Sequence, residues 1–375
     1  MNSLPCNIGV SYLIPFFWPG HTTVNRSMAA SLAQNNGNIT FHPENCSYGE
    51  PGFSACYAGH FIHRYILPLL LIAGFFGNTS SFVIMLNNAN RKVTCCLCFA
   101  VLAITDNIVL LSITIHRIKE LQETDVDLCP FYAYLMNSSS GCSSYIIVLI
   151  TCQRYNAVCH VFNEKLRITK KKAGWIMLLM IIAACLFQIP IIFTSNLRSA
   201  TECAGYSSYG IVPTVWVWMN SIIFFFIPMA VVSYWNLRIY FELRKRRNDL
   251  GQSNSNSFPL SNSSSSPDLS SSTHHYNADR KLTRMMISIS LGFICLSLPI
   301  HIRYMYYLQV TPNDNIGKAT RFLMYQLTNK LFIANHAINF YLYCLSGARF
   351  RNDFINMMKM PYRFFKELIN THCEN

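Results

Sequence analysis

Charged residues are scarce in this chain, and acidic residues are the scarcer kind. Of its 375 residues, 13% are Asp, Glu, Lys or Arg, whereas soluble domains average about 25%. Hydrophobic residues make up 51%, and 30 Lys and Arg stand against 17 Asp and Glu, for a net charge of +13. This composition excludes an ordinary soluble domain. It predicts an integral membrane protein whose spans are helices of roughly 20 apolar residues.

Motifs of catalysis, transport and conduction are also missing. The sequence has no HExxH, no paired-carboxylate motif and no nucleophile motif, so an enzyme is disfavoured. A secondary transporter would show inverted repeats with interrupted helices in matching positions. A channel would show a filter loop or rings of charge. We find none of these patterns, and a multi-span transporter stays only as a distant alternative.

Seven apolar stretches have the length of a membrane-spanning helix. Basic residues concentrate between alternate stretches, as in Lys170 to Lys172 and the RKRR run at 244–247. Cytoplasmic loops accumulate Lys and Arg, so we expect an extracellular N-terminus and a cytoplasmic C-terminus. This bias and attraction to anionic lipid explain the net charge without nucleic-acid binding. The expected spans are 62–87, 95–118, 128–153, 172–194, 212–240, 281–309 and 322–345.

The expected organisation has five parts. Residues 1–60 form an extracellular tail with glycosylation sequons at Asn25, Asn38 and Asn45. The first five helices occupy 61–243, helices six and seven occupy 281–345, and a cytoplasmic tail occupies 346–375. Between them, 244–280 is rich in Ser, Asn and Pro and is expected to be disordered, apart from basic ends that prolong the flanking helices. It is either a plain linker or a phosphorylated regulatory segment.

The expected tail contains a short amphipathic helix. Phe350, Phe354, Met357 and Met358 share one helical face, and basic residues lie elsewhere around it. Such a helix lies in the membrane interface.

Several spans carry polar residues that lipid disfavours. Asn78, Asp106, Arg154, Asn339 and Tyr343 all lie within or at the end of apolar stretches. A polar group placed there is costly unless it faces a bundle interior, a water-filled cavity or an ion. The sequence therefore predicts a hydrated polar core inside a helical bundle.

The order of these residues resembles the rhodopsin-like (class A) G-protein-coupled receptors over residues 62–360. That resemblance implies an all-α bundle of seven transmembrane helices with an eighth amphipathic helix in the membrane interface, in the plasma membrane. Its partners would be a heterotrimeric G protein, an extracellular ligand, membrane lipids, and arrestin through the Ser-rich third loop. The marks are Gly77-Asn78, Leu102-Ala103 with Asp106, Cys129 twenty-five positions before Arg154, RYNAVCH, Trp175, Pro228, Phe293 with Pro299, and NFYLY.

The resemblance also implies site residues. A sodium ion, acting as a negative modulator, would be held in a polar core, with hydration of Asp106 by water as the alternative; we expect Trp175 to pack rather than to function. Cys129 would pair with Cys203, and Cys46 with Cys56 is a weaker pairing in the tail. The polar-core residues are Asn78, Asp106, Ser143, Asn335 and Asn339. The G-protein coupling and activation residues are Arg154, Tyr155, Asn236, Phe293, Pro299, Asn339 and Tyr343.

Four positions depart from the family pattern. Gln153 replaces the acid before Arg154, and Ser297 replaces a tryptophan at the floor of the ligand pocket. Phe340 stands in place of a proline and Asn236 in place of a tyrosine. Because the first two changes remove a charge clamp and a bulky block, we expect a resting state with raised basal activity.

The outer bundle favours a peptide ligand. Met136 replaces the aspartate of amine receptors, and Ile333 replaces the lysine that binds retinal, so neither ligand is expected. The rim is aromatic and rich in hydrogen-bonding groups, although interfacial tyrosines account for part of it. The stretch around NFYLY resembles invertebrate-type neuropeptide receptors; a non-peptide small molecule or a constitutively active orphan are the alternatives. The candidate ligand-binding residues are His116, Met136, Asn137, Gln188, Asn220, His301, Tyr304, Tyr325 and Asn329.

Overall fold

The computed structural model describes residues 52–87, 94–122, 128–160, 168–199, 202–205, 211–255, 267–309, 314–347 and 350–359. The chain divides into a unit at Met1–His42 and a larger unit at Pro43–Asn375. All described residues belong to the larger unit. The three sequons and Cys46 lie outside the described residues.

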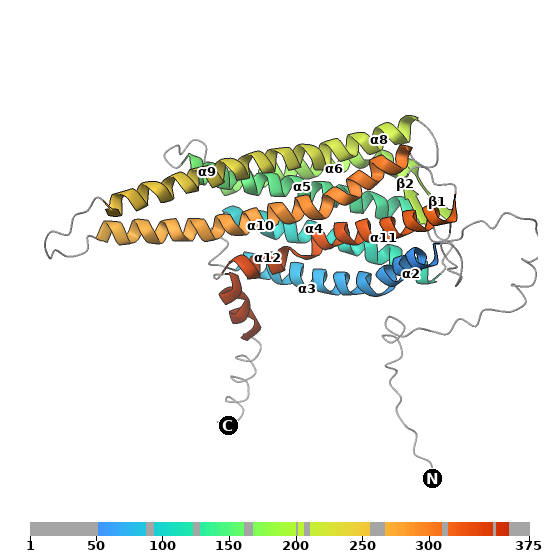
Figure 1. Ribbon diagram of the computed structural model, residues 1–375, viewed down its shortest axis with the longest axis horizontal. Helices are drawn as coiled ribbons and strands as arrows, with labels where there is room; N and C mark the ends of the chain where they lie inside the picture. The colour runs from blue at the N-terminus through green and yellow to red at the C-terminus, as the bar shows by residue number, and fades with distance from the viewer. Residues whose placement is uncertain are drawn as a thin grey trace, which may run out of the picture. The chain divides into compact units, whose positions relative to one another are not determined.

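The described part of the larger unit is helical apart from one hairpin (Figure 1). The antiparallel strands β1 (Ser195–Ser199) and β2 (Glu202–Gly205) form that hairpin, with Leu197 opposite Cys203. The helices are α2 (Phe53–Phe61), the π-helix η3 (Ile62–Ile66), α3 (Leu67–Leu86), α4 (Thr94–Gln122), α5 (Cys129–Cys159), α6 (Lys170–Gln188), α7 (Pro190–Thr194), α8 (Ile211–Ser221), the π-helix η5 (Ile222–Phe226), α9 (Ile227–Ser255), α10 (Pro267–Gln309), α11 (Asn315–Ala337) and α12 (Asn339–Ser346). Residues 350–359 are also helical.

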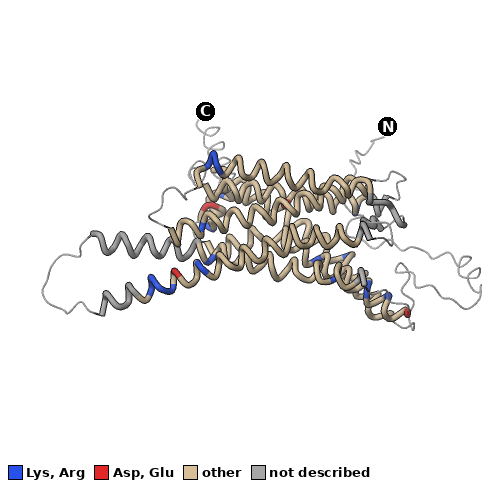
Figure 2. The backbone as a smooth tube through the Cα atoms, turned by 90° about the horizontal axis from the view of Figure 1, so that it is seen from above, with Lys and Arg blue, Asp and Glu red and all other residues tan. Residues whose placement is uncertain are grey.

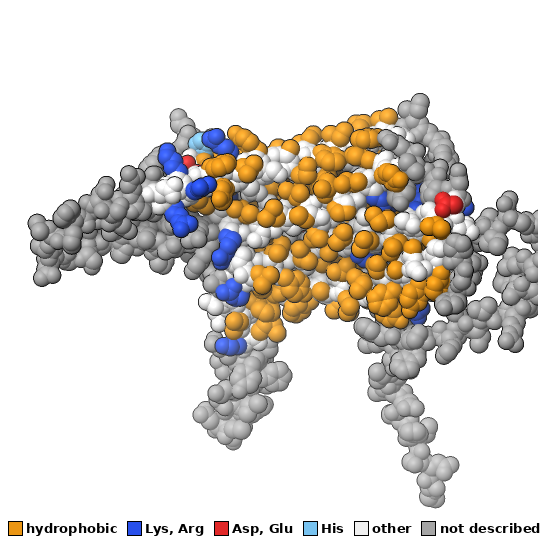
Figure 3. Space-filling model, viewed as in Figure 1, with side chains coloured by type: hydrophobic (Ala, Val, Ile, Leu, Met, Phe, Trp, Pro, Cys, Tyr) orange, Lys and Arg blue, Asp and Glu red, His pale blue; other side chains and the backbone are white. Residues whose placement is uncertain are grey.

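Among the described residues, six helical segments are long and apolar enough to cross a membrane. They are Phe53–Leu86, Thr94–Ile118, Cys129–Cys159, Lys170–Phe193, Thr214–Asn248 and Thr283–Tyr306. Each contains most of one expected span, so six of the seven expected spans are confirmed by length and composition. Figure 3 shows hydrophobic side chains covering the side of the helices, and Figure 2 shows Lys and Arg toward their ends. Long uncharged stretches between the ends are what a bilayer core requires.

The expected seventh span, 322–345, coincides with two shorter helices rather than one. The helix is interrupted at Ile338, which lies between α11 and α12. Buried polar residues on this segment, including Gln326, Lys330 and His336, lower its apolar character. That is why the expected span at 322–345 is not among the six apolar segments.

The helices on either side of the third loop extend into it, as expected for its basic ends. Within 244–280, α9 continues to Ser255 and α10 begins at Pro267, so the helices also include part of the Ser-rich stretch. Only 256–266 lies outside the described residues. Extending a helix that already exists avoids the cost of nucleating a new one, which explains why weakly helical residues continue both spans. In Figure 1 the two helices run on past the ends of the others.

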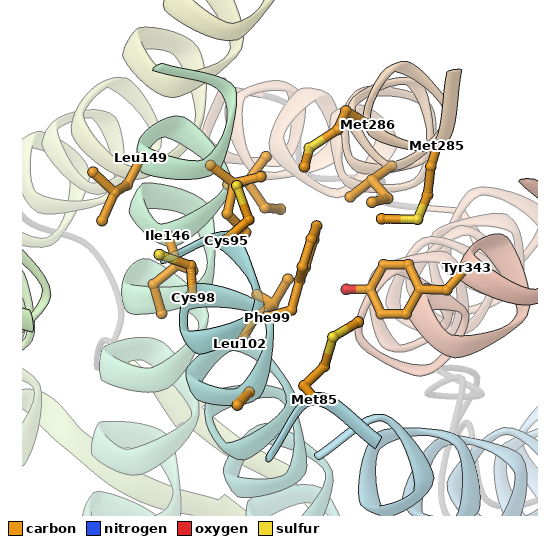
Figure 4. Packing of buried hydrophobic residues seen from close by; sticks show 14 of the residues in the cluster. Met85, Cys95, Cys98, Phe99, Leu102, Ile146, Leu149, Met285, Met286 and Tyr343 are labelled. Atoms are coloured by element: carbon orange, nitrogen blue, oxygen red, sulfur yellow. The ribbon is translucent and has the colours of Figure 1, made fainter. Parts of the chain in front are cut away.

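A sulfur-rich core joins the helices near one end of the bundle (Figure 4). Met85 and Met285 lie near the buried ring of Tyr343, which meets the ring of Phe99 edge to face with centroids 5.0 Å apart, and Cys98 lies beside Ile146 in the same cluster. Methionine and cysteine fill irregular gaps because their side chains are polarisable and adaptable. This packing places α12 against α4.

Trp175 does not pack in the bundle as expected. Trp175, on α6, is 67% exposed. The preceding residue, Gly174, also faces open space, because a Cβ added to it would have no described atom within 4 Å. An exposed tryptophan close to the lysines that begin α6 is typical of a membrane-interface anchor.

Candidate functional site

Asp106 lies at the centre of a buried polar cluster. Its side chain, on α4, is 1% exposed. Ser143 Oγ of α5 donates to Asp106 Oδ1 at 2.7 Å, and Asn339 Nδ2 of α12 donates to Oδ2 at 2.7 Å. Thr105 Oγ1 lies 2.9 Å from Ser143 Oγ. The structure therefore brings Asp106, Ser143 and Asn339 together from three helices, as the sequence predicts.

His336 completes this cluster, and sequence reasoning missed it. Its Nδ1 lies 2.8 Å from Asp106 Oδ1, and its side chain is 1% exposed. Its backbone carbonyl accepts a hydrogen bond from Asn78 Nδ2 at 3.0 Å. The signal was available, because His336 and Asn339 are three positions apart and so lie on one helical face.

Asn335 is not a partner of Asp106. It is buried, yet no hydrogen bond joins it to Asp106 in the described part of the chain. One position along a helix turns the side chain by about 100°. The neighbouring His336 therefore takes the place on Asp106 that the sequence assigned to Asn335.

Gln153 turns away from Arg154 at the other end of α5. Cys95 Sγ donates to Gln153 Oε1 at 3.1 Å, and Gln153 Nε2 donates to Cys98 Sγ at 3.3 Å, so the amide links α5 to α4. Arg154 Nε is buried and has no hydrogen-bond partner among the described residues. No ion pair of Arg154 occurs in the described ranges. The missing charge clamp predicted from Gln153 agrees with this geometry.

The ends of α5 and α9 are held by other contacts. Tyr155 stacks on Trp235 with ring centroids 6.0 Å apart and an interplanar angle of 17°. Arg246 donates to the carbonyl of Val158 near the end of α5. Positive charge near a helix C-terminus is favourable because the last carbonyls are otherwise unpaired. The neighbouring Asn236 has a buried Oδ1 without a partner in the part of the chain that is described.

An aromatic stack joins η5 to α10, the helix that carries the buried Ser297. Phe225 stacks on His301 with centroids 4.3 Å apart and an angle of 13°, and it also contacts Phe293 at 5.7 Å. His301 Nδ1 lies 3.1 Å from Ser221 Oγ. His301 lies about one helical turn after Ser297 and two residues after Pro299, which is in the interior of α10.

Three of the candidate ligand-binding residues, Tyr304, Tyr325 and Asn329, lie around Arg303. Arg303 Nε donates to Thr328 Oγ1 at 2.8 Å, and its guanidinium lies 4.6 Å from the ring centroid of Tyr304 and 5.0 Å from that of Tyr325. Its NH2 atom reaches Asn329 Oδ1 at 3.5 Å. Arg303 thus contacts three of the candidate ligand-binding residues, namely Tyr304, Tyr325 and Asn329.

Other candidate ligand-binding residues make contacts between other pairs of helices. Gln188 Nε2 of α6 donates to Asn220 Oδ1 of α8 at 3.0 Å. His116 stacks on Tyr132 with centroids 4.5 Å apart. Asn137 donates to Ala133 O within its own helix and Met136 is half-buried nearby, so neither makes a described link between helices.

Cys129 and Cys56 are both disulfide-bonded. Strand β2, which carries Cys203, contacts α5 at whose start Cys129 lies. The side chain of Cys203 is outside the described residues. The nine free cysteines of the described part, such as Cys98 and Cys142, lie in the helices.

Comparison with known proteins gives one family. Residues 78–343 match the model of the 7 transmembrane receptor (rhodopsin family). Neurotensin receptor type 1 of Rattus norvegicus is 25% identical over 253 residues, 61% of this chain and 57% of that receptor. Neuromedin-U receptor 2 of Mus musculus is 21% identical over 78% of this chain and 74% of its own length. FMRFamide peptide receptor frpr-18 of Caenorhabditis elegans is 24% identical over 45% of this chain and 43% of its own length. The chain thus spans somewhat more than half of the neurotensin receptor it matches.

Proposed function

Because the chain belongs to the rhodopsin family of seven-transmembrane receptors, we propose that it is a cell-surface receptor activated by an extracellular peptide. In this proposal the activated receptor stimulates nucleotide exchange on a heterotrimeric G protein. The observation that carries the proposal is a single buried cluster in which Asp106 joins α4, α5, α11 and α12. Such a cluster couples helix positions across the membrane, because one rearrangement changes several hydrogen bonds at once.

A peptide ligand is supported by the relatives and by the rim. The similar proteins include receptors named for neurotensin, neuromedin-U and FMRFamide peptides. The rim around Arg303 offers a guanidinium, two tyrosine rings and an amide within one region. A peptide presents both apolar side chains and backbone hydrogen-bonding groups, which suits such a mixed surface.

G-protein engagement is assigned to Arg154. Its guanidinium has a buried Nε without a described partner, so it is available to a new acceptor when the helices separate. Tyr155, Asn236, Phe293, Pro299, Asn339 and Tyr343 are proposed to take part in the transition. The proposal further includes an extracellular N-terminus, a helix at 350–359 in the membrane interface, lipid contacts at Trp175, and arrestin binding through the third loop.

The test uses membranes from cells that express the chain. Nucleotide exchange is measured on purified G proteins of several classes added to these membranes. A neuropeptide library is screened, and any activating peptide is retested on Arg154→Ala. We expect this variant to bind peptide but to lose exchange. Arg64→Ala removes an arginine from an exposed position in η3 and serves as the control, with exchange unchanged. Uptake of a labelled compound without nucleotide exchange would instead indicate a transporter.

A further inference from the structure

We propose that His336, rather than a sodium ion, completes the coordination of Asp106, so that the polar core of this receptor does not bind sodium. This inference differs from the expectation drawn from the resemblance. It rests on the contacts of Asp106 and not on the proposed peptide ligand.

Both carboxylate oxygens of Asp106 are already engaged by the chain. Oδ1 accepts from Ser143 Oγ at 2.7 Å and lies 2.8 Å from His336 Nδ1, and Oδ2 accepts from Asn339 Nδ2 at 2.7 Å. Each neighbour directs a hydrogen toward the carboxylate. A hard cation requires the opposite arrangement, in which carboxylate and neutral oxygens direct lone pairs at one point.

The donors that face Asp106 therefore do not fit sodium. Two of the three are nitrogen groups, an imidazole and an amide NH₂, and neither an N–H nor an amide NH₂ can ligate a cation through its hydrogens. Ser143 Oγ also lies 2.9 Å from Thr105 Oγ1, so a second hydroxyl competes with any cation for its lone pairs. Asn335, the neutral oxygen ligand expected from the sequence, makes no hydrogen bond to Asp106 in the described part of the chain.

His336 is also held where it is. Its ring packs edge-on against Phe332 with centroids 4.9 Å apart, and its carbonyl accepts from Asn78 Nδ2. The ring is 1% exposed, so moving it out requires a void or a displaced neighbour. A smaller hydroxyl side chain at this position would vacate the space beside Asp106 and supply an oxygen in place of the imidazole.

The experiment measures the thermal midpoint of the purified full-length receptor with sodium chloride as the only probe. Choline chloride replaces it at equal ionic strength, so only sodium-specific stabilisation registers. For the wild type we expect equal midpoints in the two salts. For His336→Ser we expect the midpoint to rise with sodium alone, by on the order of a few °C at ten times the dissociation constant. His160→Ser, at an exposed histidine, is the matched control and should behave as the wild type.

Two results would overturn the inference. One is a sodium-specific rise in the wild type, and the other is a His336→Ser receptor that stays indifferent to sodium. If that variant does not fold, the wild type is compared with Asp106→Asn: equal sodium responses support the inference, and a response lost with the carboxylate refutes it. The measurement uses neither peptide nor G protein, so its failure is distinct from a failure of the proposed function.

Discussion

Replacing Gln153 by aspartate should lower ligand-free signalling. In the structure the Gln153 amide bonds two thiols of α4, and the adjacent Arg154 Nε has no described partner. Aspartate is shorter by one methylene and cannot reproduce both thiol contacts. It can instead pair with Arg154, because the two residues are neighbours at the end of α5.

The expected size of the effect follows from two opposing terms. Losing the two amide–thiol hydrogen bonds between α5 and α4 costs about 0.5–1.5 kcal/mol each. A partly buried carboxylate–guanidinium pair favours the resting arrangement by about 1–3 kcal/mol. Since about 1.4 kcal/mol is a factor of ten, basal signalling should fall by roughly 5- to 150-fold.

The assay is basal G-protein activation at matched surface density. Gln153→Asn is the matched control, because it shortens the side chain equally but adds no charge. Its basal signalling should not fall. The reasoning is wrong if wild-type basal signalling already equals that of untransfected cells, if aspartate leaves it unchanged, or if asparagine lowers it as much as aspartate does.

Three further predictions concern the outer bundle and the core. Cys203→Ser should abolish surface expression, because it removes the proposed disulfide between Cys129 and Cys203. That bond closes a loop of 73 residues and is worth on the order of 4 kcal/mol. Mass mapping that finds Cys203 unpaired in folded receptor would contradict this prediction. Arg303→Gln should lower the potency of an activating peptide by about tenfold or more. Arg303→Lys should lower it as much, because lysine lacks the planar guanidinium that contacts Thr328, Asn329 and the rings of Tyr304 and Tyr325. Unchanged potency in a dose–response series would refute this role. Phe225→Ala should destabilise the purified receptor by about 3–5 kcal/mol, whereas Phe241→Ala, on an exposed face, should have little effect on its thermal midpoint; equal losses would refute the importance of the stack.

Much of the fold could be predicted from the sequence, because a bilayer imposes a length and an apolar composition on every span. Six expected spans correspond to helices for that reason. The interruption of the seventh span at Ile338 could not be predicted, and buried polar residues lower the apolar character of this segment. The extent of α9 and α10 could not be predicted, because serine-rich composition does not reveal that an existing helix will propagate through it.

The candidate site was predictable in part. Asp106, Ser143 and Asn339 were found because each is a polar residue at a family position in a span. His336 and the stack of Phe225 on His301 were not, because each depends on contacts between side chains of different helices that the sequence alone does not show. The family pattern shows which residues this sequence lacks, whereas the side-chain contacts in the structure show which other residues lie at those places.

The departures at Gln153 and His336 have one physical consequence in common. At the end of α5, an amide bonded to thiols stands where an acid would pair with Arg154. At Asp106, an imidazole of the chain stands where the resemblance implies an ion. In both places, hydrogen bonds between side chains replace an interaction between opposite charges: an ion pair with Arg154 in the first case and a sodium ion bound to Asp106 in the second. We therefore expect the resting state to depend little on sodium chloride, because in our proposal it contains no bound sodium ion and its buried contacts are screened only weakly by salt. It also depends more on packing, so core variants such as Phe225→Ala should alter basal signalling more than sodium does.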